Sequence, residues 1–165
     1  MVEKELYYEM DTRKHQQVVA ELLISFAKKL LDRAIKHDAS KLKEPERSYY
    51  IEPVYALNTE EVPYGSERYK ELTKQMGEGW DHHKAVNDHH IEFFIPYSVQ
   101  TLNDPLKAMD LFALVEMLAD WIAASRRRNN SSTKALDFLK EKYGVDHQLE
   151  MIIRNTLAMM ETENG

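Results

Sequence analysis

The chain of 165 residues contains no cysteine, only five glycines and five prolines, and no long hydrophobic run. The absence of cysteine excludes disulfide bonds and thiolate metal sites, and with the lack of a recognisable signal peptide it favours a reducing, cytoplasmic environment. The apolar runs are too short and too often interrupted by charge to span a membrane. Scarce glycine and proline, together with 30% charged residues, are typical of a helical protein.

The net charge is −6, with acidic and basic residues mixed along the chain. A protein that binds nucleic acid normally presents a basic face, so we expect neither a nucleic-acid nor a membrane partner. A small phosphorylated ligand needs only a few local cations and is compatible with this balance. The length is typical of one domain, residues 1–165, that buries a core without disulfides.

The spacing of apolar residues predicts an all-α, single-domain helical bundle of five to seven helices. Apolar residues three to four apart predict an amphipathic helix over 12–37, with Asp11 or Thr12 as its N-cap. A second helix is predicted from Ser66, interrupted at Gly77 and Gly79, and a third from Asp104-Pro105 to about Arg127. A loop at 129–132 follows. The last two predicted helices are Thr133–Tyr143, ended by Gly144, and one that Asp146 caps and that runs through about Met160.

Between the first two of these helices, Pro45, Pro53 and Pro63 predict a long connection with one short helix at Glu46–Tyr50. Connections of this length in small domains are often active-site walls. Its aromatic residues suit stacking against a base: Tyr49, Tyr50, Tyr55 and Tyr64.

Histidine is concentrated in two short clusters, each beside an aspartate. His82, His83, His89 and His90 fall within nine residues, and His37-Asp38 lies upstream. Imidazole and carboxylate together are the ligand set of a catalytic divalent metal site. Solvated surface is the alternative for any single histidine, but five of the seven in this grouping predict a metal centre.

The spacing within the histidine run requires a break in the helix. The two pairs are seven residues apart, so on a continuous helix they would stand about 10 Å from each other, too far for one ion. Asn87 and Asp88 favour a break, because their side chains compete for backbone hydrogen bonds. We therefore expect helix to about Asn87 and a restart beyond Asp88, with Asn87 orienting a ligand or capping the second segment.

A further candidate ligand, Asp120, lies in the most apolar predicted helix. A buried carboxylate must face a cation or several donors, so Asp120 is predicted to bind the metal. Glu116, one turn earlier, is either an acceptor behind a ligand or a surface residue. Lys41, three residues after Asp38, is placed to bind a substrate phosphate or to steady metal-bound hydroxide; the alternative is a helix-end cation.

His15 is also a candidate, but it lies 22 residues before His37 in a segment without a turn signal. On one unbroken helix about 33 Å would separate them. His15 can therefore join the site only if the segment bends back or if it comes from another subunit. Met151, Met159 and Met160 are compatible with a homodimer face or with ordinary core.

The order of His15, His37-Asp38 with Lys41, the paired histidines and Asp120 resembles the HD superfamily of metal-dependent phosphohydrolases. The resemblance implies an HD-like helical core with one or two divalent ions. It implies that His37, Asp38 and Asp120 hold the first ion, and that Asp38 bridges to a second ion bound by the histidine pairs.

A second resemblance covers most of the chain. The segments His37–Leu42, Tyr64–Lys70, Asp81–His90 and Glu116–Trp121 resemble a family of uncharacterised bacterial and phage proteins known only as a domain of unknown function, DUF5662. This family supplies no activity.

Together with the candidate metal ligands, the resemblance to the HD superfamily implies a metal-dependent phosphohydrolase acting on a nucleotide or another small phosphate ester or diester, with Asp38 and Lys41 as catalytic residues. Nitrogen and oxygen ligands without sulfur suit Mn²⁺, Fe²⁺, Zn²⁺, Co²⁺ or Ni²⁺. The alternatives are a non-catalytic, metal-stabilised protein that binds a small ligand and a phage-type protein that acts on a host partner. An enzyme keeps an open coordination position beside a pocket, whereas a structural site is closed by protein ligands.

Overall fold

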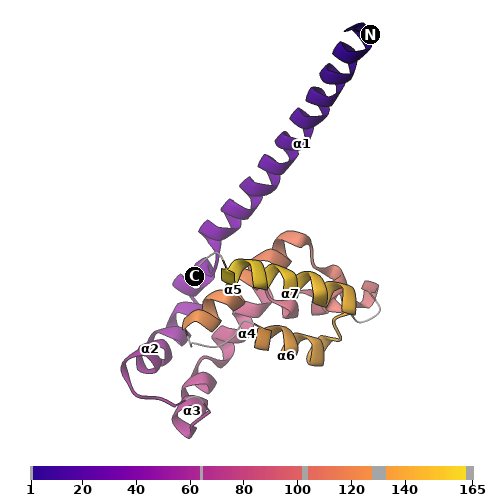
Figure 1. Cartoon of the computed structure of the whole chain (residues 1–165). Helices are drawn as coiled ribbons and strands as arrows, with labels where there is room; N and C mark the ends of the chain where they lie inside the picture. The colour runs from indigo at the N-terminus through magenta and orange to yellow at the C-terminus, as the bar shows by residue number, and fades with distance from the viewer. Residues whose placement is uncertain (1, 64, 102–103, 128–132, 163–165) are drawn as a thin grey trace. The chain divides into compact units, whose positions relative to one another are not determined.

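The computed structural model describes residues 2–63, 65–101, 104–127 and 133–162 (Figure 1). Over these residues the regular structure consists of seven α-helices and three 3-10 helices without a strand, which confirms the predicted all-α class. The chain divides into two units, one ending at His37 and the other beginning at Asp38.

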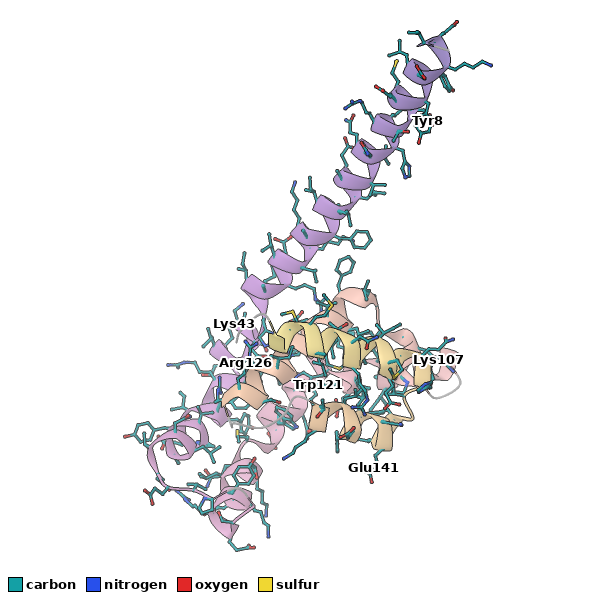
Figure 2. All side chains as sticks on the ribbon, in the orientation of Figure 1. Tyr8, Lys43, Lys107, Trp121, Arg126 and Glu141 are labelled. Atoms are coloured by element: carbon teal, nitrogen blue, oxygen red, sulfur yellow. The ribbon has the colours of Figure 1, made fainter. Side chains whose placement is uncertain are left out.

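The first unit is a single helix, α1 (Val2–Lys36). It begins ten residues before the predicted start, so the assignment of Asp11 or Thr12 as N-cap is wrong. Glutamates in its first turn and basic residues in its last turn complement the helix dipole. Side chains project from every side of α1, as a unit made of one helix requires (Figure 2). Neither α1 nor any other described helix has the apolar run needed to cross a bilayer.

The second unit opens with η1 (Ala39–Leu42), α2 (Glu46–Thr59), α3 (Glu67–Gln75) and α4 (Gly77–Val86). The predicted long connection is wrong, because most of it is the 14-residue α2. Pro53 lies inside this helix, where its fixed φ is compatible with helical backbone and only one backbone hydrogen bond is lost. Its buried residues, Glu46, Tyr50, Pro53 and Ala56, are three to four apart and so form one face. Tyr64, one of the predicted stacking residues, lies outside the described residues.

The remainder of the unit comprises η2 (Ile91–Thr101), η3 (Pro105–Ala108), α5 (Leu111–Arg127), α6 (Thr133–Tyr143) and α7 (His147–Thr162). The predicted helix from Asp104 is divided, because two aspartates cap two successive starts. Asp104 accepts from the Leu106 N–H at 3.1 Å, and Asp110 accepts from the Ala113 N–H at 2.9 Å. The predicted loop at 129–132 lies outside the described residues.

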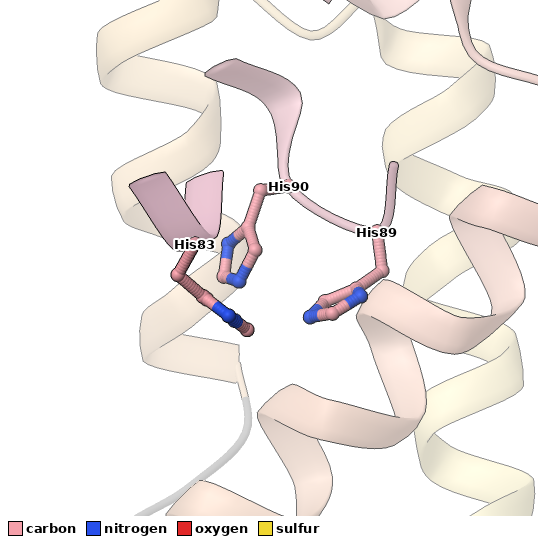
Figure 3. Close-up of side chains that lie close together, drawn as sticks. All are labelled: His83, His89 and His90. Carbon is pink, nitrogen blue, oxygen red and sulfur yellow. The ribbon is translucent and has the colours of Figure 1, made fainter. Parts of the chain in front are cut away.

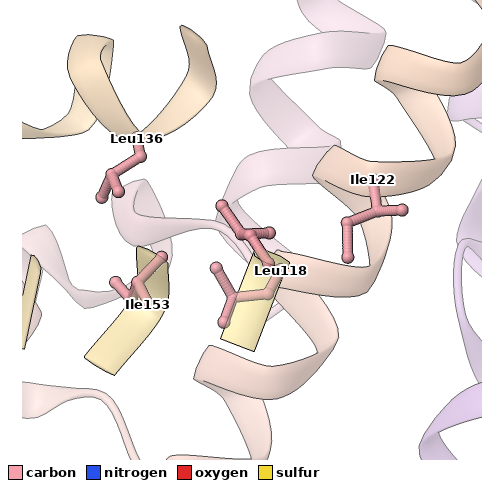
Figure 4. Packing of buried hydrophobic residues seen from close by; sticks show 5 residues of the cluster. Leu118, Ile122, Leu136 and Ile153 are labelled. Carbon is pink, nitrogen blue, oxygen red and sulfur yellow. The ribbon is translucent and has the colours of Figure 1, made fainter. Parts of the chain in front are cut away.

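The last two helices agree with the sequence. Gly144 ends α6 with a φ of 68°, and the Asp146 carboxylate accepts from the Leu149 N–H at 2.9 Å at the start of α7. Helices α5, α6 and α7 share a buried apolar cluster of Leu118, Ile122, Leu136, Ile153 and Leu157 (Figure 4). A second cluster, Ile91, Met117, Leu139 and Val145, extends this core to η2. The start of η2, directly after the histidine run, is therefore anchored on α5 and α6.

Candidate metal centre

Three imidazole rings of the second unit converge on one point (Figure 3). His83 comes from α4, whereas His89 and His90 come from the turn between α4 and η2. One ring nitrogen of each lies within 4.8 Å of the others, His83 and His89 being buried and His90 partly buried. The convergence depends on the end of α4 at Val86, so the predicted break in the histidine run is confirmed.

Asn87 shapes the turn that brings these rings together. Its backbone is extended, with φ −116° and ψ 111°, and its N–H donates to the His83 carbonyl at 3.1 Å. Its side-chain Nδ2 donates to the same carbonyl at 2.8 Å and to Ser40 Oγ at 2.9 Å. Asn87 therefore ends α4 and ties the turn to η1.

Asp38 places a carboxylate beside the three rings. Its Oδ1 lies 3.1 Å from His83 Nε2 and 3.6 Å from His89 Nε2, and its Oδ2 accepts from Lys41 Nζ at 2.6 Å. The backbone of Asp38 is left-handed, with φ 56° and ψ 12°. Aspartate tolerates this conformation better than most residues, but it still carries strain, and strained backbone is often retained at functional sites.

Behind two of the imidazoles stand further carboxylates. His83 Nδ1 lies 2.9 Å from Glu46 Oε2, and His89 Nδ1 lies 3.2 Å from Glu116 Oε1. An Nδ1–H that donates to a carboxylate fixes the ring and its tautomer, and leaves the Nε2 lone pair free for a cation. Both Nε2 atoms then face the side on which Asp38 lies.

Glu46 is fully buried and still ionised. Burial raises the pKa of its carboxyl group, but hydrogen bonds from His82, Ser40 and His83 lower the pKa by more, so that the net shift is downward. The contacts are 2.8 Å from His82 Nδ1, 2.9 Å from Ser40 Oγ and 2.9 Å from His83 Nδ1. The negative charge of Glu46 therefore remains in place behind the histidines.

His90 is held in its neutral form. Burial of the ring lowers the pKa of this imidazole to about 4. At neutral pH the ring consequently carries a lone pair and no charge, which is the state that binds a metal.

Two ring nitrogens of these histidines, His83 Nε2 and His90 Nε2, are buried without a hydrogen-bond partner in the described part of the chain. When His83 donates through Nδ1 to Glu46, its Nε2 and the Asp38 Oδ1 face each other at 3.1 Å as two acceptors. Burying an unsatisfied polar group costs about 1–3 kcal/mol, and two facing lone pairs add repulsion. A cation between them removes both costs, so this buried group of histidine and carboxylate side chains can hold a metal ion.

The other predicted ligands occupy different positions. His82 turns to Glu46 and is 41% exposed, and it is not part of the three-histidine group. Asp120 lies on α5 and lines a cavity next to the group. Lys41 forms an ion pair with Asp38, with 2.6 Å between Nζ and Oδ2, and its predicted contact with a substrate stays a prediction. His37 is the last residue of the first unit and precedes Asp38 in the chain, and its role as a ligand stays a prediction.

His15 was expected to join the site only if its segment bends back or if it comes from another subunit, and the structure excludes the first of these. Because α1 is unbroken, His15 and His37 are about 33 Å apart along one helix, so they cannot bind the same ion within one chain. Only a contribution from another subunit would remain for His15.

Sequence reasoning missed Glu46 and Ser40. Glu46 follows Pro45 at the start of a helix, where an acidic residue is common because it complements the helix dipole. That context gave no signal for a second role. Glu116 was named as an acceptor behind a ligand, and it contacts His89.

A cavity of about 260 Å³ adjoins the group. His89 and His90 belong to its wall, together with residues of α4, η2, α5 and α6. The other lining residues are Trp80, Ile91, Glu92, Met117, Asp120, Trp121, Phe138, Leu139 and Tyr143.

A family model described as a family of unknown function (DUF5662) matches residues 4–159. No curated protein and no solved structure matches the chain. The match confirms one of the two resemblances seen in the sequence. Nothing in these comparisons supports the other, to the HD superfamily.

Proposed function

The chain belongs to this family of unknown function, DUF5662, and we propose that it is a metal-dependent hydrolase of small phosphate esters or diesters. The observation that carries the proposal is that His89 and His90 belong both to the candidate metal group and to the wall of the cavity. An ion held there would face a space in which a substrate can bind, as a catalytic site requires.

In this proposal Asp38, His83, His89 and His90 hold one ion. A divalent ion bound there supplies Lewis-acid chemistry, because it activates water and offsets charge on a phosphate. Glu46 and Glu116 hold the His83 and His89 rings through Nδ1. Lys41 balances the charge of Asp38. Three nitrogens and one oxygen without sulfur suit Mn²⁺, Fe²⁺, Co²⁺, Ni²⁺ or Zn²⁺.

Metal content and turnover test this proposal together. The protein is purified without added metal, its ions are identified by elemental analysis, and hydrolysis of 4-nitrophenyl phosphate, bis(4-nitrophenyl) phosphate and a nucleotide panel is measured with each metal. We expect His83→Ala and His90→Ala to lose both metal and turnover. His147→Ala is the matched control, since this histidine is 84% exposed on α7 and lies outside the group. Retention of stoichiometric metal in both site variants would refute the site.

A second candidate function follows from the number of ligands. Three histidines and one aspartate fill all four positions of a tetrahedral ion, which is the closed arrangement of a structural zinc site. A six-coordinate ion on the same ligands keeps two positions open. Bound zinc that raises the melting temperature, with no turnover of any substrate under any of the metals, would favour the structural function.

A further inference from the structure

The cavity beside the metal group has an apolar floor, formed by Ile91, Met117 and Leu139. Each of the three side chains is at most 3% exposed, and they belong to the buried cluster that joins η2, α5 and α6. Trp121 packs against the same cluster and also lines the cavity. The floor is therefore part of the packed core, which holds its shape before a ligand binds.

The charged groups of the cavity wall have partners within the chain. Glu92 Oε1 accepts from Lys142 Nζ at 3.3 Å and from the Tyr143 hydroxyl at 3.2 Å. Lys142 Nζ also lies 4.8 Å from the centre of the Tyr143 ring, and Asp120 has an interaction of its own. Because these groups are engaged before a ligand arrives, they do not select a charged one. Away from the metal group, the wall offers a ligand its apolar surface.

The size of the cavity restricts what this surface can cover. Its volume is about 260 Å³. An apolar cavity of about 150 Å³ already holds a benzene ring, and pockets for drug-sized ligands measure about 300–1,000 Å³. The space therefore suits one six-membered ring or a compact branched alkyl group. A sugar or a base suits it poorly, since each polar group that leaves water without a new partner costs about 1–3 kcal/mol.

We propose that the cavity binds an uncharged apolar group, and that the substrate is a phosphate ester of a compact hydrocarbon or aryl alcohol. His89 and His90 belong both to the metal group and to the cavity wall, so an ester whose phosphate binds at the metal can direct its organic group into the cavity. As a statement about the substrate, the inference rests on the proposed hydrolase function. Binding of the apolar group itself does not require the metal.

Cyclohexanol and myo-inositol provide a matched pair of probes, because they share a six-membered carbon ring and differ in the number of hydroxyl groups. Both tryptophans of the chain line the cavity, so intrinsic tryptophan fluorescence reports on its occupancy. In the presence of a chelator we expect a saturable change with cyclohexanol, and an affinity at least about tenfold lower for myo-inositol, whose additional hydroxyl groups lose their hydrogen bonds to water. Absence of saturable cyclohexanol binding, or equal affinity for the two probes, would overturn the inference.

Two variants place the binding in this cavity. Met117→Gln keeps the length of the side chain and makes the floor polar, so it should lower cyclohexanol affinity at least about fivefold. Phe138→Ser should lower it about threefold, and because Phe138 is 59% exposed, its replacement leaves the core intact. Ile152→Ser is the control, since it removes an apolar side chain of similar exposure, 61%, from α7 and outside the cavity. Undiminished affinity in Phe138→Ser and in folded Met117→Gln would refute the assignment to the cavity.

Turnover separates this inference from the proposed function. Cyclohexyl phosphate and adenosine 5′-monophosphate are both esters of alkyl alcohols, so their different organic groups decide which is preferred. We expect kcat/KM to be at least about tenfold higher for cyclohexyl phosphate, which corresponds to about 1.4 kcal/mol. Cyclohexanol binding without turnover of any ester under any of the metals would leave the apolar site standing and refute the hydrolase. Turnover that favours the nucleotide would leave the hydrolase standing and refute the assigned substrate class.

Discussion

Glu46 and His83, 37 residues apart in the chain, are both fully buried and meet through a contact of 2.9 Å between Oε2 and Nδ1. The pair joins the start of α2 to α4. A buried carboxylate is tolerated only when its lone pairs are satisfied, and Glu46 meets this condition with His82, Ser40 and His83. The contact that joins α2 to α4 therefore also orients the ring of His83, a candidate metal ligand.

Glu46→Gln tests this dual role. The amide keeps the shape of the side chain but loses the charge and one acceptor, so the His83 ring is held less firmly. We expect metal affinity to fall about 10- to 100-fold, measured by competition with a chromophoric chelator. We also expect the metal-free protein to lose about 1–3 kcal/mol in urea unfolding, because a buried donor is left unsatisfied. Glu52→Gln, an exposed position on the same helix, is the control. Wild-type affinity in Glu46→Gln would show that the carboxylate does not position the ligand.

The features that the sequence predicts well are those with local physical causes. Asn87 breaks a helix because its side chain bonds the backbone, and Gly144 ends another because it adopts a positive φ. Both effects act within a few residues. The convergence of His83 with His89 and His90 follows from the first of them, since it depends on one turn.

The features that the sequence does not predict depend on contacts across the fold. Glu46 approaches His83 because α2 packs on α4, and the sequence carries no local signal for this packing; Pro53 also argued against a helix as long as α2. Tertiary packing outweighed the local cost of a proline in this case. Asp38 needed the left-handed conformation at the start of η1 to face the rings, which nothing in His37-Asp38 itself signals.

Asp38→Asn distinguishes the role of the Asp38 carboxylate in metal binding from the role of its backbone conformation in the turn. Asparagine tolerates the left-handed conformation as well as aspartate does, so the turn should persist. The variant loses the negative charge that faces His83 and His89, and we expect metal affinity to fall at least about tenfold. In chelator, its unfolding free energy should stay within about 1 kcal/mol of the wild type, because the ion pair with Lys41 is partly exposed. Asp38→Ala should lose affinity as well and be less stable than Asp38→Asn, since alanine is strained at positive φ. Undiminished metal affinity in both variants would exclude Asp38 as a ligand.

Gly79 sets how closely α4 approaches α2. A Cβ at this position would lie 2.6 Å from the Tyr49 Cβ, whereas a Cβ at Gly77 would meet nothing within 4 Å. Gly79→Ala should therefore force the two helices apart and cost about 1–3 kcal/mol in urea unfolding. It should also weaken metal binding, because Glu46 on α2 supports His83 on α4. Gly77→Ala, on the same helix, should be neutral or stabilising by up to about 1 kcal/mol. Equal stability of the two variants would show that the close contact can relax without cost.

Glu150 should make stability depend on pH far from the metal group. It is buried at 6% exposure, and hydrogen bonds from Lys140 at 2.7 Å and Arg154 at 2.9 Å lower the pKa of its carboxyl group below the ordinary value of 4.5. The unfolded chain takes up this proton before the folded protein does as the pH falls. The stabilisation is therefore complete above about pH 4.5 and is lost as the pH falls through the folded-state pKa.

Glu150→Gln should be less stable than the wild type at pH 7, and the difference in unfolding free energy should shrink below pH 4.5. Glu141→Gln, an exposed position on α6, should differ little from the wild type at any pH. If the difference in unfolding free energy between Glu150→Gln and the wild type stays constant from pH 7 to pH 3, Lys140 and Arg154 bind this side chain through its hydrogen-bonding shape and not through its charge.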